Sequence, residues 1–195
     1  MPTINTKSID GGPSSSNRKK EIPQPASIST APIRSLGVGL MMAGAAAGAL
    51  AADRTVSVTE AVNLAAPPSQ TWEKIRDFSS WQAWHPAFAG TEIIKGRGNT
   101  KGTVRVLITK DGAKFTEELV AHDDASHTYS YRITESPLPI TDYVSQLEVR
   151  GVKGGSNVVW SSNFHVKDGA SEEEMKKAIS GVYRAGLDNL GSVVK

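Results

Sequence analysis

SEEEMKKAISGVYRAGLDNLGSVV, residues 171–194, carries the strongest helix pattern in the chain. Ser171 followed three residues later by Glu174 forms a capping box, and three consecutive glutamates match the positive end of the helix dipole. Apolar residues then recur at spacings of three and four, which predicts one buried helix face. The predicted face consists of Met175, Ile179, Val182, Gly186, Leu190 and Val193.

Gly186 is unusual on that face, because a glycine inside a helix costs about 1 kcal/mol relative to alanine. Its missing side chain allows another chain segment or a bound molecule to approach the helix closely. Ordinary packing of the helix on a sheet is the favoured interpretation, and contact with a ligand is the alternative.

The segments between residues 55 and 166 alternate apolar and polar residues and are separated by turn signals, so most of them are predicted strands. We expect strands at residues 55–64, 91–95, 102–109, 113–122, 128–135, 141–149 and 157–166, with a loop at 151–156. The predicted fold class is α+β, with a curved antiparallel sheet of about seven strands around one long C-terminal helix.

Two short helices are expected after the first strand, in the sequence PPSQTWEKIRDFSSWQAWHP. Pro68 suits the first turn of a helix that runs to about Phe78. Ser79 or Ser80 is a suitable N-cap for a second helix, which Pro86 ends. The aromatic residues of this stretch either form a core cluster or cover an apolar pocket. They are Trp72, Phe78, Trp81 and Trp84.

The first 51 residues differ in composition from the rest. Residues 1–32 are rich in Ser, Pro, Gly and Lys, which predicts a disordered leader. Residues 33–51 resemble a secretory signal peptide, with an uncharged Ala- and Gly-rich core that ends in an A-x-A pattern at Ala51. We therefore expect cleavage near Ala51, a periplasmic or secreted domain at residues 52–195, and no stable membrane span. An uncleaved anchor and a cytosolic tail are the alternatives.

Charge and motif content exclude several functions. The first 51 residues contain five basic and two acidic side chains, so the remainder has 17 basic and 18 acidic ones and a net charge of −1. Such a domain has no electrostatic footprint for nucleic acid. The chain has no cysteine, its four histidines lack metal-ligand spacing, and no nucleotide-binding motif occurs, so neither a metal nor a cofactor is expected.

Several motifs resemble the START-like superfamily, also called SRPBCC, and within it the polyketide cyclase/dehydrase group. The order of strand, two short helices, six strands and long helix agrees with that superfamily, and the resemblance covers residues 56–194. Further motifs are similar to the MxaD-like subgroup. The motifs are FSSWQAWHP (78–86), GTVR (102–105), DG (111–112), EEL (117–119), SPLP (136–139), DY (142–143), WSSNF (160–164) and VYRAGLDNL (182–190).

The resemblance implies a helix-grip fold with an internal cavity, and three functions follow from it. One is a binding protein for a small apolar molecule, which we favour. Another is a cyclase-like or lyase-like enzyme that works by proton transfer. The third is an accessory protein for a periplasmic dehydrogenase, as in the MxaD-like subgroup.

Arg105, Glu117 and Tyr143 are the implied site residues, because lachrymatory-factor-synthase-like members carry these residue types in the pocket at matching positions. Glu117 and Tyr143 are the catalytic candidates. We expect Arg105 to keep the pKa of Glu117 low, which favours a hydrogen-bond acceptor for a ligand over a general base. Trp84, His85 and Gly186 are further ligand-binding candidates, although a structural role for His85 is favoured.

The hairpin around Asp111-Gly112 decides whether Arg105 meets Glu117. A two-residue turn pairs Arg105 with Glu118 and gives an apolar face of Val104, Val106, Ile108, Phe115 and Leu119. A three-residue turn with a glycine bulge places Arg105 opposite Glu117, in agreement with the family. The residues alone leave both registers open. The resemblance implies the second one, with Arg105, Glu117 and Tyr143 converging in the cavity.

Overall fold

A computed structural model describes residues 55–194; the predicted leader and signal segment lie outside these residues. The elements follow in the predicted order. They are β1 (Thr55–Leu64), α1 (Pro68–Ile75), the 3₁₀ helix η1 (Trp81–Ala83), β2 (Phe88–Lys95), β3 (Val104–Thr109), β4 (Lys114–Asp123), β5 (Thr128–Glu135), β6 (Ile140–Val152), β7 (Gly155–Val166) and α2 (Glu172–Val193).

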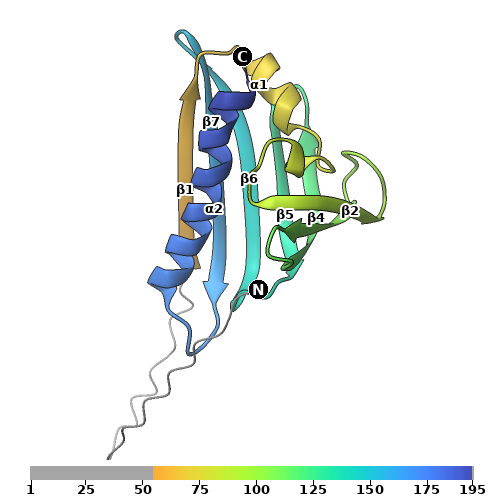
Figure 1. Ribbon diagram of the computed structural model, residues 1–195, viewed down its shortest axis with the longest axis vertical. Coiled ribbons are helices and arrows are strands. Elements are labelled where there is room, and N and C mark those ends of the chain that lie inside the picture. Colours follow the sequence, from red (N-terminus) through yellow and green to blue (C-terminus); the bar gives the residue numbers. More distant parts are fainter. Residues whose placement is uncertain (1–54, 195) are drawn as a thin grey trace, which may run out of the picture. The chain divides into compact units, whose positions relative to one another are not determined.

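The strands form one antiparallel sheet in the order β1-β7-β6-β5-β4-β3-β2. The sheet curves so strongly that β2 runs across the direction of β1 and β7 (Figure 1). Helix α2 lies on the concave side and packs mainly on β1 and β7. The predicted helix-grip fold is therefore confirmed.

Helix α2 begins as its sequence predicts, because the Ser171 side chain accepts a hydrogen bond from the backbone N–H of Glu174 at 3.2 Å. Its buried face is rotated relative to the prediction. Val182 is exposed, whereas Tyr183 and Leu187 are fully buried. The predicted face contained only aliphatic residues and glycine, but Tyr183 packs its ring against that of Trp160, with 4.1 Å between the centroids.

The two predicted short helices differ in type and length from the expectation. Helix α1 ends at Ile75 instead of continuing to Phe78, and the second is a single 3₁₀ turn at Trp81–Ala83. The residues between them are tied to distant parts of the chain. The Phe78 N–H donates to the Asn99 side chain in the turn between β2 and β3, and His122 on β4 bonds the Arg76 carbonyl. All four aromatic side chains of this stretch are buried in the core.

The β3–β4 hairpin adopts the three-residue turn. Thr109 N–H donates to the Ala113 carbonyl at 2.9 Å, and Gly112 has a φ of 88°. This register pairs Arg105 with Glu117. The two-residue alternative is not adopted: Arg105 and Leu107 point into the core, and Val104, Val106 and Ile108 are on the other face.

Strands β6 and β7 are longer than predicted and continue through most of the expected loop. Their pairing reaches Val152 opposite Gly155, so only Lys153 and Gly154 form the turn. A Cβ at Gly155 would lie 1.9 Å from the Leu64 carbonyl oxygen. This close approach requires glycine and explains why a glycine-rich stretch remains within a strand.

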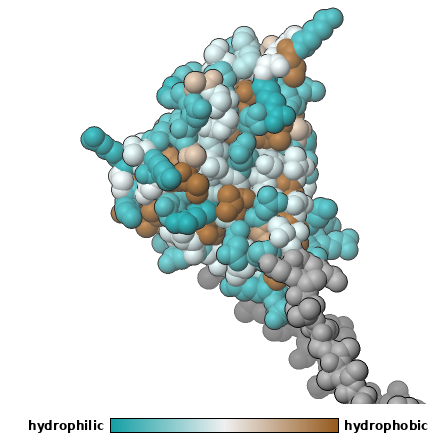
Figure 2. Space-filling view, turned by 180° about the vertical axis from the view of Figure 1, so that it is seen from behind, coloured by the Kyte–Doolittle hydropathy of each residue, from teal (hydrophilic) through white to brown (hydrophobic). Residues whose placement is uncertain are grey.

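The outer face of the sheet alternates in polarity. Seen from behind, its apolar patches are small and are separated by hydrophilic residues (Figure 2).

Among residues 55–194, no helix is both long enough and apolar enough to span a membrane.

Candidate functional site

An ion pair between Arg105 and Glu117 lies inside the core. Arg105 Nε donates to Glu117 Oε2 at 2.8 Å, and Nη2 lies 2.6 Å from the same oxygen. Neighbouring strands β3 and β4 place the two side chains opposite each other on the concave face. The relative exposure is 0% for Arg105 and 4% for Glu117, so this pair has lost almost all contact with solvent.

Arg105 is held from several sides. Its guanidinium carbon lies 3.8 Å from the ring centroids of both Phe78 and Trp81, and Nη1 donates to the Phe78 carbonyl at 2.6 Å. A desolvated cation gains from two aromatic faces as well as from its carboxylate. The aromatic stretch before β2 therefore positions the cation of the site.

Glu117 keeps one oxygen without a protein partner. Both contacts with Arg105 use Oε2, and within residues 55–194 no hydrogen bond reaches Oε1. Burial raises the pKa of the Glu117 carboxyl above its ordinary value, although Arg105 opposes that shift. This corrects the expectation of a low pKa, because desolvation outweighs one ion-pair partner in this position.

Tyr143 reaches the concave face through a β-bulge. The pairing of β6 with β7 shifts between Thr141 and Val144, and Asp142 has a φ of 53°. The bulge breaks the strict alternation of β6, so two exposed residues precede the buried tyrosine. The Tyr143 hydroxyl lies 2.5 Å from that of Tyr183 and 3.5 Å from that of Tyr131.

Proton counting gives a direction to this hydroxyl chain, since each hydroxyl has one proton. Ser145 donates to the Ser161 carbonyl at 2.8 Å, so Tyr183 must donate to Ser145 at 3.2 Å. Tyr143 then donates to Tyr183, and Tyr131 donates to Tyr143. Each hydroxyl in this series therefore donates its own proton to the next group. The bond from Tyr131 to Tyr143 is the longest, at 3.5 Å, so Tyr131 is the hydroxyl that can most easily donate to a ligand instead.

Burial raises the pKa of all three tyrosines well above the ordinary value. Their hydroxyls stay neutral at physiological pH and act as hydrogen-bond donors and acceptors. Tyr143 therefore fits the role of an orienting group better than that of a base.

A pocket of about 90 Å³ lies beside these groups, between the sheet and α2. Glu117 and Tyr143 both line it, together with Tyr131, Trp160 and Tyr183. The remaining wall is almost entirely apolar, with residues from the loop before β2, from β3 to β5 and from α2. They are Trp81, Ala87, Phe88, Leu107, Thr109, Phe115, Ile133, Leu138, Ile179 and Val182.

The structure brings the predicted site residues together only in part. Arg105 contacts Glu117 from behind the pocket wall, and Tyr143 bonds to Tyr183 rather than to either of them. Trp84, His85 and Gly186 do not line the pocket. His85 Nε2 bonds the Val182 carbonyl at 3.0 Å, and a Cβ at Gly186 would lie 2.4 Å from His85 Cδ2, so the glycine accommodates the histidine.

Four polar residues of the site were missed in the sequence: Tyr131, Ser145, Trp160 and Tyr183. Three of them lie on strands at positions that alternate inward, and Trp160 Nε1 donates to both Tyr131 and Ser145. Their inward spacing was visible in the sequence, but it carries no chemical signal until the strands are paired. Among residues 55–194, no cluster of three metal-ligating side chains occurs.

The comparison with known families decides the classification. The family model described as polyketide cyclase / dehydrase and lipid transport matches residues 55–195. The chain belongs to this family. The membership confirms the broader resemblance drawn from the motifs, whereas the MxaD-like subgroup stays a prediction.

Solved structures agree with the membership in this polyketide cyclase family. The protein XoxI from Bacillus cereus is 30% identical over 71% of this chain and 95% of its own, with a TM-score of 0.66. A protein from Bacillus thuringiensis is 29% identical over 71% of this chain and 98% of its own, with a TM-score of 0.65. Ara h 8.0201, at 21% identity, 72% and 98% coverage and a TM-score of 0.61, shares the fold.

Proposed function

We propose that the domain binds a small, mostly apolar molecule that carries a hydroxyl group or another hydrogen-bond donor. The observation that carries this proposal is Glu117 Oε1, which has no protein donor and belongs to a residue that is 4% exposed and lines an apolar pocket. A buried acceptor of this kind gains free energy when a ligand donor reaches it. A ligand hydroxyl also accepts the proton that Tyr131 shares only weakly with Tyr143.

The size of the pocket limits the ligand. Drug-sized ligands occupy pockets of about 300–1,000 Å³, and a cavity of about 150 Å³ holds benzene. The 90 Å³ pocket is smaller than both, so a molecule of the size of phenol fits only after the wall moves outward, and larger molecules are excluded. Val182 lines the pocket and is 38% exposed, which gives the pocket an opening beside α2.

A calorimetric comparison of phenol, toluene and benzene tests this proposal. We expect phenol to bind at least tenfold more tightly than toluene, which has a methyl group in place of the hydroxyl and no donor. Glu117→Gln should lose most of that preference, whereas Glu118→Gln, on the opposite face of β4, should keep it. Equal affinities for phenol and toluene in the natural protein would refute the proposed role of Glu117.

A proton-transfer enzyme is the second candidate, and the raised pKa of Glu117 favours it. A carboxylate whose pKa moves towards neutrality is a better general base than an ordinary one. Deuterium exchange into the α-position of cyclopentanone, followed by NMR, tests the activity. Loss of exchange in Glu117→Gln with phenol affinity retained indicates an enzyme, and loss of affinity without any exchange activity indicates a binding protein.

The accessory role beside a periplasmic dehydrogenase rests on the MxaD-like motifs. A pull-down with the full chain from a periplasmic extract tests it. Recovery of a dehydrogenase would support this role, and its absence from repeated pull-downs would argue against it.

A further inference from the structure

Strands β5 and β6 separate at one end of the sheet. Their pairing runs from Thr128 opposite Glu148 to Arg132 opposite Val144 and stops there. Beyond that point, β5 pairs only with β4, and β6 pairs with β7. We call residues 133–135 and 140–143, together with the connecting residues 136–139, the β5–β6 fork.

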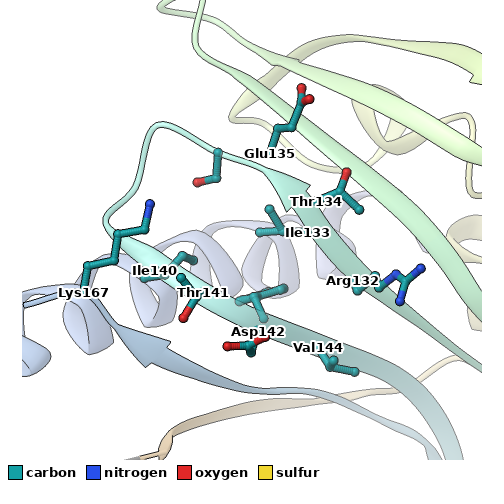
Figure 3. A pocket seen from close by; sticks show the side chains of 11 residues that line it. Arg132, Ile133, Thr134, Glu135, Ile140, Thr141, Asp142, Val144 and Lys167 are labelled. Carbon is teal, nitrogen blue, oxygen red and sulfur yellow. The ribbon is translucent and has the colours of Figure 1, made fainter.

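A groove of about 750 Å³ occupies the outer side of this fork. Figure 3 shows side chains from both strands around it, with Ile133, Thr134 and Glu135 on one strand and Ile140, Thr141 and Asp142 on the other. Helix α2 passes behind the two strands in the same view. The groove is therefore on the opposite side of the sheet from the helix.

Two side chains, those of Ile133 and Tyr143, line both this groove and the internal pocket. The connecting loop shows the same arrangement, since Ser136 lines the groove and Leu138 lines the pocket. No backbone pairing joins β5 and β6 across the fork, so the sheet is closed at this point only by the packing of side chains.

We infer that the β5–β6 fork is a second mouth of the ligand pocket, which opens through the outer face of the sheet and is closed here by Ile133 and Tyr143. The inference extends the proposed function, because the mouth would admit the same small hydroxylated molecules. Ile133 is the movable part, since its half-buried side chain packs against the core and has no hydrogen bond to hold it. Tyr143 is held by its hydrogen bond to Tyr183.

A buried cysteine can measure access to the pocket without any ligand. The natural chain has no cysteine, so Leu107→Cys places a single thiol on the pocket wall at a residue that is 1% exposed. Methyl methanethiosulfonate, a small apolar reagent, labels this thiol, and mass spectrometry follows the rate. In this background, Ile133→Ala should raise the labelling rate at least tenfold.

Two control variants separate the fork from general loosening. Ile179→Ala makes the same truncation in the pocket wall on α2, and Val144→Ala shortens a side chain that lines only the groove. Both should change the rate less than threefold. An increase in Ile179→Ala as large as that in Ile133→Ala would overturn the inference, because the opening beside α2 would then account for access to the thiol without a second mouth.

The dependence on urea adds a second criterion. The rate of labelling through the fork should be nearly independent of urea at low concentration. Labelling that requires global unfolding should instead increase with urea as steeply as the unfolding equilibrium constant does. Such a steep increase in the Ile133→Ala background would overturn the inference. Because labelling needs no ligand, a second mouth can be present even if phenol fails to bind, so the two proposals fail separately.

Discussion

Gly186→Ala should destabilise the protein although it improves the helix propensity of α2. A Cβ at this position would lie 2.4 Å from His85 Cδ2, 2.9 Å from His85 Nε2 and 3.0 Å from Trp84 Cζ3. Ordinary van der Waals contacts begin at 3.4 Å. The histidine ring would therefore have to move by about 1 Å, since packed interiors have few voids to absorb the added methyl group.

The histidine ring is not free to move. The Ala87 N–H donates to His85 Nδ1 at 3.2 Å, so Nε2 carries the proton and donates to the Val182 carbonyl at 3.0 Å. Overpacking costs about 1–3 kcal/mol and a lost hydrogen bond about 1 kcal/mol, against a propensity gain of about 1 kcal/mol. The free energy of unfolding should fall by about 1–3 kcal/mol.

Gly181→Ala is the matched control on the same helix. Gly181 is exposed, and a Cβ there would have no atom within 4 Å. This variant should gain about 0.4–1 kcal/mol. Urea unfolding, followed by tryptophan fluorescence, should therefore give opposite signs for two identical substitutions five residues apart.

A Gly186→Ala variant as stable as Gly181→Ala would contradict this prediction. Such a result would mean that α2 does not approach His85 as closely as the structure has it. It would also reopen the interpretation of Gly186 as a residue that leaves room for a ligand.

Three other predictions concern charge and processing. Glu117→Gln should lower the free energy of unfolding by about 3–5 kcal/mol because Arg105 stays buried without its carboxylate, whereas Glu118→Gln should change it by less than about 1 kcal/mol; urea titrations measure both. Burial lowers the pKa of His85 from 6.5 to about 4 in the folded state. Between these pH values the unfolded state binds a proton that the folded state does not, so the free energy of unfolding should fall by about 3 kcal/mol as the pH falls from 6.5 to 4. His85→Gln should show a smaller loss than the natural protein over that range, and an unchanged pH profile would contradict this assignment. Mass spectrometry of the native protein should find an N-terminus at or near Ala52, and an intact N-terminus in the cytosolic fraction would contradict export.

Local patterns were sufficient to predict the fold. The capping box at Ser171, the alternation in the strands and the glycine-containing turns are short-range features, and each depends on residues that lie within a few positions of one another. The fold class and the element order followed from them, whereas the family was indicated by the resemblance of several motifs. Boundaries were less accurate where distant contacts decide, as at Ile75, where α1 ends earlier than its sequence suggests.

Tertiary structure alone decided which residues meet in the site. The apolar pattern of β3 favoured Val104, Val106 and Ile108 as the buried face, yet the turn at Gly112 shifts the register by one residue and buries Arg105 instead. A charged side chain is stable there because Phe78 and Trp81, more than twenty residues earlier, stack on its guanidinium. No short stretch of the sequence shows this stabilisation of Arg105. It arises only when the sheet curves around α2 and brings the segment with Phe78 and Trp81 onto β3.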